Sequence, residues 1–125
     1  MIVVDASAVL AATLNERGAD RINIPAVARV ISAVNACEVL TRLLDLGWNM
    51  TDAIASFDRF DFESVPFDAE QAQAAAFLRL NTRHLGISLG DRACLALAMA
   101  RCLPVLTAYR VWASLDLGIE IRLVR

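Results

Sequence analysis

The sequence contains no lysine and only one histidine, His84, so its twelve permanently basic side chains are all arginines. The absence of lysine excludes P-loop phosphate binding and Schiff-base catalysis, which both depend on a lysine amine. A single histidine excludes zinc sites that are built from several histidines. The reactive groups that remain are mainly carboxylates, and the chain has fourteen of them.

Long apolar runs are also missing, although 58% of the residues are hydrophobic. The longest, around residues 8–14 and 93–100, are far shorter than the roughly 18–20 residues that a membrane-spanning helix needs. Asp5 interrupts the apolar N-terminal stretch early, which is not typical of a secretory signal. We therefore expect a cytoplasmic protein without a membrane segment. The length suits one hydrophobic core, so residues 1–125 are expected to form a single domain.

The cysteines are few, odd in number and without the spacing of metal ligands. Cys37, Cys94 and Cys102 each have apolar neighbours in the sequence, so we expect all three to be reduced residues of the core. The net charge of −2 indicates no generally basic surface. A nucleic acid would therefore have to be bound by a local cluster of arginines.

Short apolar runs and helix signals alternate along the chain, which predicts a parallel sheet with helices on both faces. Gly18 and Gly47 are expected to end the first two helices, and Ser88 and Asp91 form a capping-box pattern. We expect strands at residues 1–5, 30–32, 62–67, 104–107 and 119–124. Helices are expected at residues 6–17, 33–46, 52–60 (capped by Thr51 or Asp52), 68–84, 91–102 and 110–115.

Two of these helices have informative patterns. In the helix at residues 33–46, Val39, Leu40, Leu43, Leu44 and Leu46 form an apolar stripe. Its other face carries Glu38, Thr41, Arg42 and Asp45. Between Arg92 and Arg101 every residue is apolar, so that helix should be buried on nearly all sides.

Three carboxylates are placed where a parallel sheet forms ligand sites, beyond the carboxyl ends of its strands. Asp5 ends the first strand, Glu38 lies one turn into the helix after the second, and Asp91 lies in the first turn of the helix before the fourth. If the first and fourth strands are neighbours, the three acids converge. Clustered carboxylates need a compensating cation or proton, and oxygen ligands suit Mg²⁺ or Mn²⁺. Such a metal activates water for attack on a phosphodiester, which is nuclease chemistry.

Each acid also has a purely structural explanation. Asp5 is a good N-cap for the first helix, Glu38 has the spacing for an ion pair with Arg42, and Asp91 can complete the capping box of Ser88. Any one of these acids alone would be weak evidence for a site. The joint placement of all three at one sheet edge favours the functional interpretation.

Four blocks of sequence resemble one known family: "MIVVDASAVLA", "ISAVNACEVLTRLLDLG", "LGISLGDRACLALAMARCLPVLTAYRVW" and "LDLGIEIRLVR". They are similar, in this order and over essentially the whole chain, to PIN-domain toxins of the VapC type, from VapBC toxin–antitoxin pairs. The resemblance implies a three-layer α/β/α sandwich with a parallel five-stranded sheet. It also implies a Mg²⁺- or Mn²⁺-dependent endoribonuclease, with an RNA substrate, a cognate antitoxin and a homodimeric state.

The resemblance also assigns roles to individual residues. Asp5, Glu38 and Asp91 fall on the family's acid positions, which are catalytic and bind the metal, and Ser7 falls on a hydroxyl position that supports the first acid. Tyr109 stands where the family usually has a further aspartate. A phenol, with a pKa of about 10, is neutral at pH 7 and a poor ligand for a hard cation. Tyr109 is therefore either an attenuating change, or the natural site works with three acids and recruits Asp116.

RNA binding would need positive charge beside the acids. Arg92 and Arg110 directly follow two of the site positions and are candidates for phosphate contacts, although each is equally well explained as a solvated surface residue. Trp48 and Trp112 could stack on bases, but packing is the favoured role for both. The aromatic residues between Trp48 and Phe62 predict either a docking site, for which the resemblance implies the antitoxin, or part of the core.

Two alternatives to the nuclease remain. The first is a catalytically inactive PIN-fold module that only binds RNA or its antitoxin. The second is an unrelated flavodoxin-like ligand binder. It is disfavoured because such a fold needs a glycine-rich phosphate loop after the first strand, and the segment "DASAVLA" contains no glycine.

Overall fold

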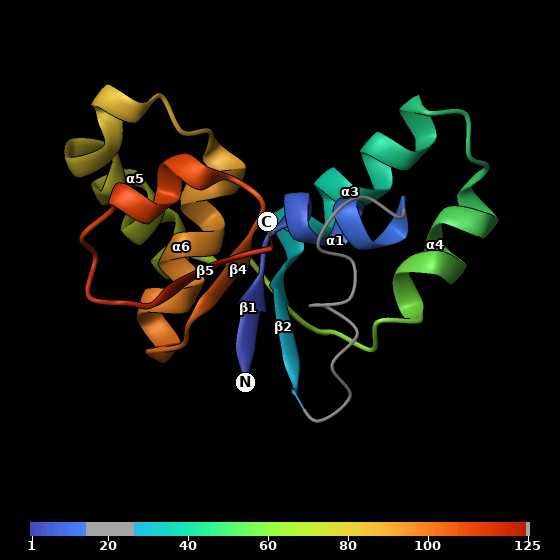
Figure 1. Cartoon of the computed structure of the whole chain (residues 1–125), viewed down its shortest axis with the longest axis horizontal. Coiled ribbons are helices and arrows are strands. Elements are labelled where there is room, and N and C mark those ends of the chain that lie inside the picture. Colours follow the sequence, from blue (N-terminus) through green and yellow to red (C-terminus); the bar gives the residue numbers. More distant parts are fainter. Residues whose placement is uncertain (15–26, 125) are drawn as a thin grey trace.

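The structure is a computed structural model, and it describes residues 1–14 and 27–124. Its centre is a parallel sheet with the strand order β3-β2-β1-β4-β5 (Figure 1). The register places Val3 of the central strand between Val30 and Val105, so the first and fourth strands are neighbours, which is the condition for the three acids to converge. The strands are β1 (Ile2–Val4), β2 (Arg29–Ser32), β3 (Glu63–Val65), β4 (Val105–Thr107) and β5 (Ile121–Leu123).

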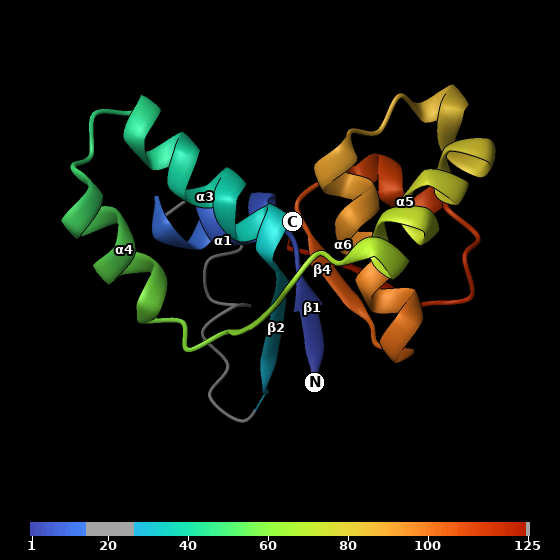
Figure 2. The ribbon, with the colours of Figure 1, turned by 180° about the vertical axis from the view of Figure 1, so that it is seen from behind.

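Helices cover both faces of this sheet, as the sequence predicts. Figures 1 and 2 show α1, α3 and α4 on one side and α5 and α6 on the other. The described α-helices are α1 (Ala6–Thr13), α3 (Ala33–Asp45), α4 (Met50–Asp58), α5 (Ala69–Thr82) and α6 (Leu89–Arg101). Two short 3₁₀ helices, η1 (Arg83–Leu85) and η2 (Arg110–Ser114), follow α5 and β4. Of the helices described, none combines the length and the apolar character that crossing a membrane requires.

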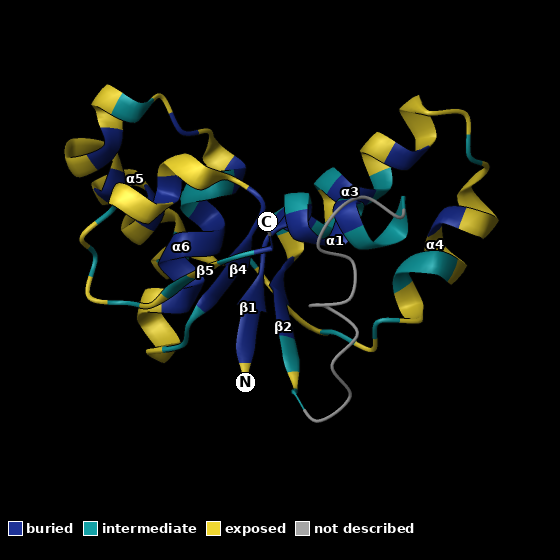
Figure 3. Cartoon of the chain, viewed as in Figure 1, coloured by how far each residue is buried: buried dark blue, intermediate teal, exposed yellow. Residues whose placement is uncertain are grey.

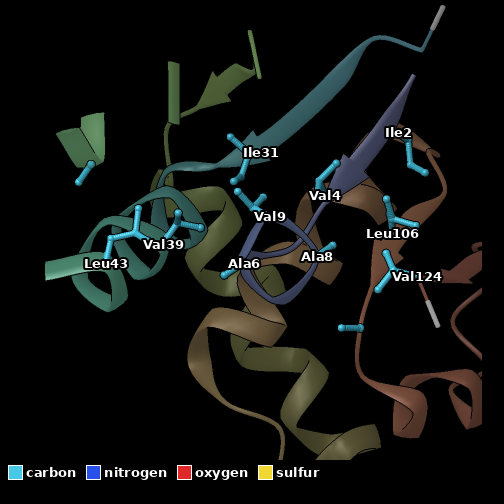
Figure 4. Close-up of a cluster of buried hydrophobic side chains, with 12 residues drawn as sticks. Ile2, Val4, Ala6, Ala8, Val9, Ile31, Val39, Leu43, Leu106 and Val124 are labelled. Carbon is cyan, nitrogen blue, oxygen red and sulfur yellow. The ribbon is translucent and has the colours of Figure 1, made fainter. Parts of the chain in front are cut away.

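Alternation along the strands produces two apolar clusters, one on each face of the sheet. Ile2 and Val4 point to the same side as Ile31 and Leu106, where Figure 4 shows them beside side chains of α1 and α3. Val3 points to the opposite face and packs with the buried residues of α6. The three inner strands β1, β2 and β4 are accordingly mostly buried, whereas the edge strands β3 and β5 and the outer faces of the helices carry exposed residues (Figure 3).

The aromatic segment between α3 and β3 belongs mainly to the first cluster. Trp48, Phe57, Phe60 and Phe62 are partly buried against it, and the ring centroids of Phe57 and Phe62 are 5.3 Å apart. The helix here begins with Asn49, whose side chain accepts a hydrogen bond from the Asp52 N–H. The prediction of Thr51 or Asp52 as the cap was therefore wrong. The helix starts earlier than predicted, and Asn49, three residues before Asp52, caps it.

The prediction that all cysteines lie in the core was wrong for two of them. All three are free thiols, but only Cys94 is buried, whereas Cys37 and Cys102 are exposed. Cys37 lies on the polar side of α3, opposite Val39 and Leu43. Cys102 follows the last residue of α6 in a left-handed conformation, with φ at 53°. Apolar neighbours in sequence do not place a helical residue in the core, because successive helical positions point in different directions.

Other boundaries shift by a few residues. The segment at residues 93–98 is buried as predicted, but Met99 and Ala100 in the last turn of α6 are exposed and line a shallow hollow beside α5. Gly47, with a φ of 96°, follows the end of α3 as predicted. The predicted stop at Gly18 and the helix extension to residue 17 lie outside the described residues.

Candidate active site

A cavity of about 650 Å³ opens beyond the carboxyl ends of β1 and β4. Its walls come from the start of α1, the polar face of α3, the segment that leads into α6, and Tyr109 after β4. Asp5, Glu38 and Asp91 all line it. Three carboxylates that are far apart in the sequence thus surround one space, as their strand-end positions predict.

Asp5 is almost completely buried, with 2% of its surface exposed. Its Oδ1 accepts hydrogen bonds from the Ser7 hydroxyl, at 2.6 Å, and from the Ala8 N–H, at 3.0 Å. Its Oδ2 accepts one from the Thr107 hydroxyl at 2.9 Å. Asp5 therefore caps α1 and faces the cavity at the same time, so its structural and functional interpretations are compatible.

The electrostatic environment of the acids disfavours their charged forms. Burial raises the pKa of Asp5 to about 6, against the hydrogen bonds from Ser7, Ala8 and Thr107 that lower it, and the charge of Asp91 raises it further. Burial also raises the pKa of Glu38, with a smaller contribution from Asp91. The charge of Asp91 thus acts on both of the other acids across the cavity. A cation placed there would offset both the burial and the repulsion.

Glu38 is held by Asn35, a residue that is only 1% exposed. The Asn35 amide donates to Glu38 Oε2 and to the carbonyl oxygen of Gly90, both at 3.0 Å. A Cβ at position 90 would overlap Glu38 Oε1, so glycine is what leaves room for the Glu38 carboxylate in this position. The sequence-based pairing of Glu38 with Arg42 is thus replaced by a hydrogen bond within α3 and a contact to α6.

Asp91 carries out the structural role that its sequence pattern predicts. Its Oδ2 accepts a hydrogen bond from the Ser88 N–H at 2.9 Å, and its own N–H donates to the Ser88 hydroxyl at 3.2 Å. This reciprocal capping box confirms the prediction for the start of α6. It also holds the Asp91 carboxylate at the cavity wall.

The donor set fits a hard divalent cation that keeps part of its water shell. In residues 1–14 and 27–124, no three Asp, Glu, His or Cys side chains are gathered closely enough to ligate one metal ion together. Mg²⁺ does not require such a cage, because it usually binds one or two carboxylates directly and fills its other positions with water. The carboxylates of this cavity satisfy that smaller requirement.

Tyr109 and Asp116 differ in their relation to the cavity. Tyr109 lines it, and its N–H donates to the Thr107 hydroxyl at 3.1 Å. Asp116 is exposed on the segment between η2 and β5 and is not among the lining residues. The structure therefore does not support the recruitment of Asp116 as a replacement acid.

Among the described residues, the arginine that lines the cavity is not one of the two that the sequence suggested as phosphate contacts, Arg92 and Arg110. The guanidinium of Arg92 donates to the carbonyl oxygen of Ala75 in α5 at 3.0 Å, and Arg110 is exposed at the start of η2. Neither lines the cavity, whereas Arg42 and Asp45 of α3 do. Sequence analysis missed these two, although the apolar stripe of their helix had already assigned them to the same face as Glu38.

Comparisons with solved structures give similar folds in toxin–antitoxin proteins. The DNA-bound VapBC from Salmonella typhimurium is 18% identical, with a TM-score of 0.75 and coverage of 100% of both chains. VapBC-5 from Mycobacterium tuberculosis is 27% identical, with a TM-score of 0.62 and coverage of 99% of this chain and 97% of that one. VapC20 from the same organism, described as a sarcin-ricin loop cleaving toxin, is 16% identical, with a TM-score of 0.73 and coverage of 96% and 99%.

A comparison with curated protein sequences found no match. A family model described as the PIN domain matches residues 2–116, which is most of the chain. The parallel five-stranded sheet fits that match, and the sequence resemblance to this family is confirmed. The chain therefore belongs to the PIN-domain family.

Proposed function

We propose that this chain is a Mg²⁺- or Mn²⁺-dependent endoribonuclease and the toxin of a type II toxin–antitoxin pair. The observation that carries the proposal is the placement of Asp5, Glu38 and Asp91 around one cavity, where burial and the charge of Asp91 raise the pKa values of the first two. PIN-domain nucleases generally use divalent metal ions. The whole of residues 1–125 is proposed to act as one PIN-like domain in the cytoplasm.

The residues of the cavity have separate tasks in this proposal. Asp5, Glu38 and Asp91 would hold the metal, which when bound would activate water and stabilise charge on the scissile phosphate. Ser7 and Thr107 orient the Asp5 carboxylate through their hydroxyl groups. Such hydrogen bonds fix the direction of the ligand oxygens, and their loss typically lowers metal affinity by about 10- to 100-fold.

Arg42 is the proposed phosphate contact in this cavity. It is exposed, it lines the same wall as Glu38, and its guanidinium has the planar geometry that suits phosphate oxygens. Arg92 is not a proposed phosphate contact, because its guanidinium donates a hydrogen bond to the carbonyl oxygen of Ala75 in α5.

A cognate antitoxin and a second copy of the chain are the proposed partners. Structural neighbours include toxin–antitoxin complexes, such as one from Klebsiella pneumoniae. The end of α3, the turn after it and the first half of α4 expose apolar side chains of the kind that a protein partner covers. These are Leu44, Leu46, Met50 and Ile54. We propose this surface as the place where the antitoxin docks.

One specific observation favours a second candidate, an inactive PIN-fold module that binds RNA or its antitoxin. Tyr109 occupies a position where the family usually has an acid, and a neutral phenol adds nothing to the affinity for a hard cation. A module of this kind would keep the fold and the partner surface without binding metal.

Calorimetric titration with Mn²⁺ separates the two candidates. The nuclease predicts saturable binding that Asp5→Ala weakens by about tenfold or more, in line with the loss of a direct ligand. Asp116→Ala, which removes an acid outside the cavity, is the control and should leave the affinity unchanged. Saturable Mn²⁺ binding accompanied by Mn²⁺-dependent cleavage of RNA supports the nuclease. Absence of Mn²⁺ binding in the wild-type protein would leave only the inactive module.

A further inference from the structure

We propose that the ring of Tyr109 forms a nucleobase-stacking subsite within the cavity, where it binds a base of single-stranded RNA while Arg42 contacts a neighbouring phosphate. This inference rests on the proposed function, since it assigns a substrate contact to the same cavity. It gives the tyrosine a binding role in place of the metal-ligand role that an aspartate would have at that position.

The first argument is the position of the ring. Tyr109 lines the cavity together with Asp5, Glu38 and Asp91, and 47% of its surface is exposed. Its backbone N–H donates to the Thr107 hydroxyl, and that hydroxyl donates to Asp5. Two hydrogen bonds therefore link the backbone of Tyr109 to one of the acids. A base on this ring would be held at a defined place relative to the reacting phosphate.

The second argument is that the ring is already supported before anything binds. Trp112 is completely buried, and its ring centroid lies 5.9 Å from that of Tyr109 with an angle of 43° between the planes. A side chain that is ordered in advance loses little conformational entropy when a ligand binds. The free energy of stacking would then contribute to RNA affinity, because little of it is offset by the entropy cost of ordering the ring.

The third argument is the chemical match between the cavity and a nucleotide. A volume of about 650 Å³ is in the range of small-molecule sites, roughly 300–1,000 Å³. In this subsite the ring of Tyr109 binds the base and Arg42 binds a phosphate. The three carboxylates of the same cavity would hold the metal ion. Stacking on an aromatic side chain accepts every base, so the subsite should tolerate different sequences.

The test measures RNA binding without cleavage and detects stacking directly. Single-stranded RNA 10-mers of mixed sequence, each with one 2-aminopurine, are titrated with protein in EDTA, and anisotropy and 2-aminopurine quenching are recorded. Tyr109→Leu should weaken binding by about 5- to 30-fold and abolish the quenching. Tyr109→Phe, which keeps the ring, should bind and quench like the wild type. Phe77→Leu removes a ring that is 69% exposed on α5, outside the cavity, and should change nothing.

Cleavage kinetics in Mn²⁺ provide the second readout. Loss of a binding contact predicts that Tyr109→Leu raises KM more than it lowers kcat. Equal RNA affinity and equal KM in the Leu and Phe variants would overturn the stacking subsite while the nuclease proposal stands. A loss of affinity in Phe77→Leu as large as in Tyr109→Leu would also overturn it, by indicating unspecific aromatic contacts. Failure of the wild-type protein to bind or cleave any RNA would overturn the proposed function together with the subsite.

Discussion

At the scale of single residues, Tyr109 stands where the sequence resemblance leads us to expect an aspartate, and this difference bears first on the proposed metal site. A carboxylate at position 109 would add a hard, charged oxygen to the wall that carries Asp5 and Asp91. We predict that Tyr109→Asp raises the rate of Mn²⁺-dependent RNA cleavage at saturating RNA by at least about tenfold, through stronger metal binding. The same substitution should raise KM, because it removes the proposed stacking ring.

The measurement is cleavage of a fluorescent RNA over a range of Mn²⁺ concentrations. Tyr109→Asn is the control, since it has a similar size to aspartate but no charge. If the wild-type and Tyr109→Asp proteins cleave at equal saturating rates, tyrosine is not an attenuating change, and the site functions with three acids.

Asp5 provides a prediction about stability in the absence of metal. Its pKa is about 6 in the folded chain and 3.8 for the unperturbed group, so between these values the folded state binds more protons than the unfolded state. Stability contributed by this group therefore falls as pH rises through that window and stays low above it. A shift of about 2 pKa units corresponds to about 3 kcal/mol.

We therefore predict that Asp5→Asn stabilises the metal-free protein at about pH 7 by up to about 3 kcal/mol, and has little effect at about pH 4. The amide keeps an oxygen that can accept the Ala8 N–H bond of the helix cap. Urea unfolding in EDTA at both pH values measures the effect. Parallel pH dependences in the two proteins would show that burial of the Asp5 charge does not destabilise the fold.

At the scale of elements, the contact between α3 and α6 positions Glu38. The Asn35 amide joins the two helices, and Gly90 leaves the space into which the Glu38 carboxylate fits. From the sequence alone, a glycine at position 90 is expected only to destabilise its helix. In the structure, the absence of a side chain at Gly90 makes room for Glu38 of α3.

Gly90→Ala should accordingly separate stability from activity. Alanine favours a helix over glycine by about 0.5–1 kcal/mol, and the group that it displaces is the flexible end of Glu38. We expect the free energy of unfolding to change by less than about 1 kcal/mol, while Mn²⁺ affinity and RNA cleavage fall about tenfold or more. Unfolding curves and calorimetry measure the two effects.

Gly47→Ala offers the opposite outcome as a comparison. Its φ of 96° strains any side chain, and nothing lies within 4 Å of the added Cβ. It should cost about 1–2 kcal/mol of stability and leave Mn²⁺ binding intact. If Gly90→Ala keeps full Mn²⁺ affinity, the space above Gly90 is not needed to orient Glu38.

At the scale of the whole molecule, the charge distribution limits how RNA is held. The net charge is −2, and of the arginines in the part of the chain that the structure describes, Arg42 lines the cavity. Binding of single-stranded RNA through one or two phosphate contacts predicts a slope of about −1 in a plot of log affinity against log salt. The interaction should therefore be much less sensitive to salt than that of a strongly basic nucleic-acid-binding protein.

Two matched variants test which arginine supplies that contact. Arg42→Ala should make the slope shallower by about 0.7, the value for one phosphate on a single strand. Arg110→Ala, at the start of η2 outside the cavity, should leave the slope unchanged. The reverse result would place the RNA along η2, as the sequence-based hypothesis has it.

Much of this molecule could be predicted from its sequence. The alternation of strands and helices follows from local apolar patterns, and the cap at Ser88 and Asp91 follows from a four-residue motif. The joint placement of Asp5, Glu38 and Asp91 follows from a general property of parallel sheets. These features depend on interactions between residues that are near in sequence, or on the one topology that such an alternation favours.

Only the tertiary structure decided which polar side chains share the cavity and which do not. Arg92 follows Asp91 directly, yet its guanidinium bonds to Ala75 of the neighbouring helix α5. Arg42 and Tyr109, in contrast, are 67 positions apart in the chain and line the same cavity. The burial that raises the pKa of Asp5, and the space above Gly90, likewise depend on packing between distant elements. The physical reason is that side-chain direction and desolvation are set by the neighbours that folding brings together, and the local pattern does not contain them.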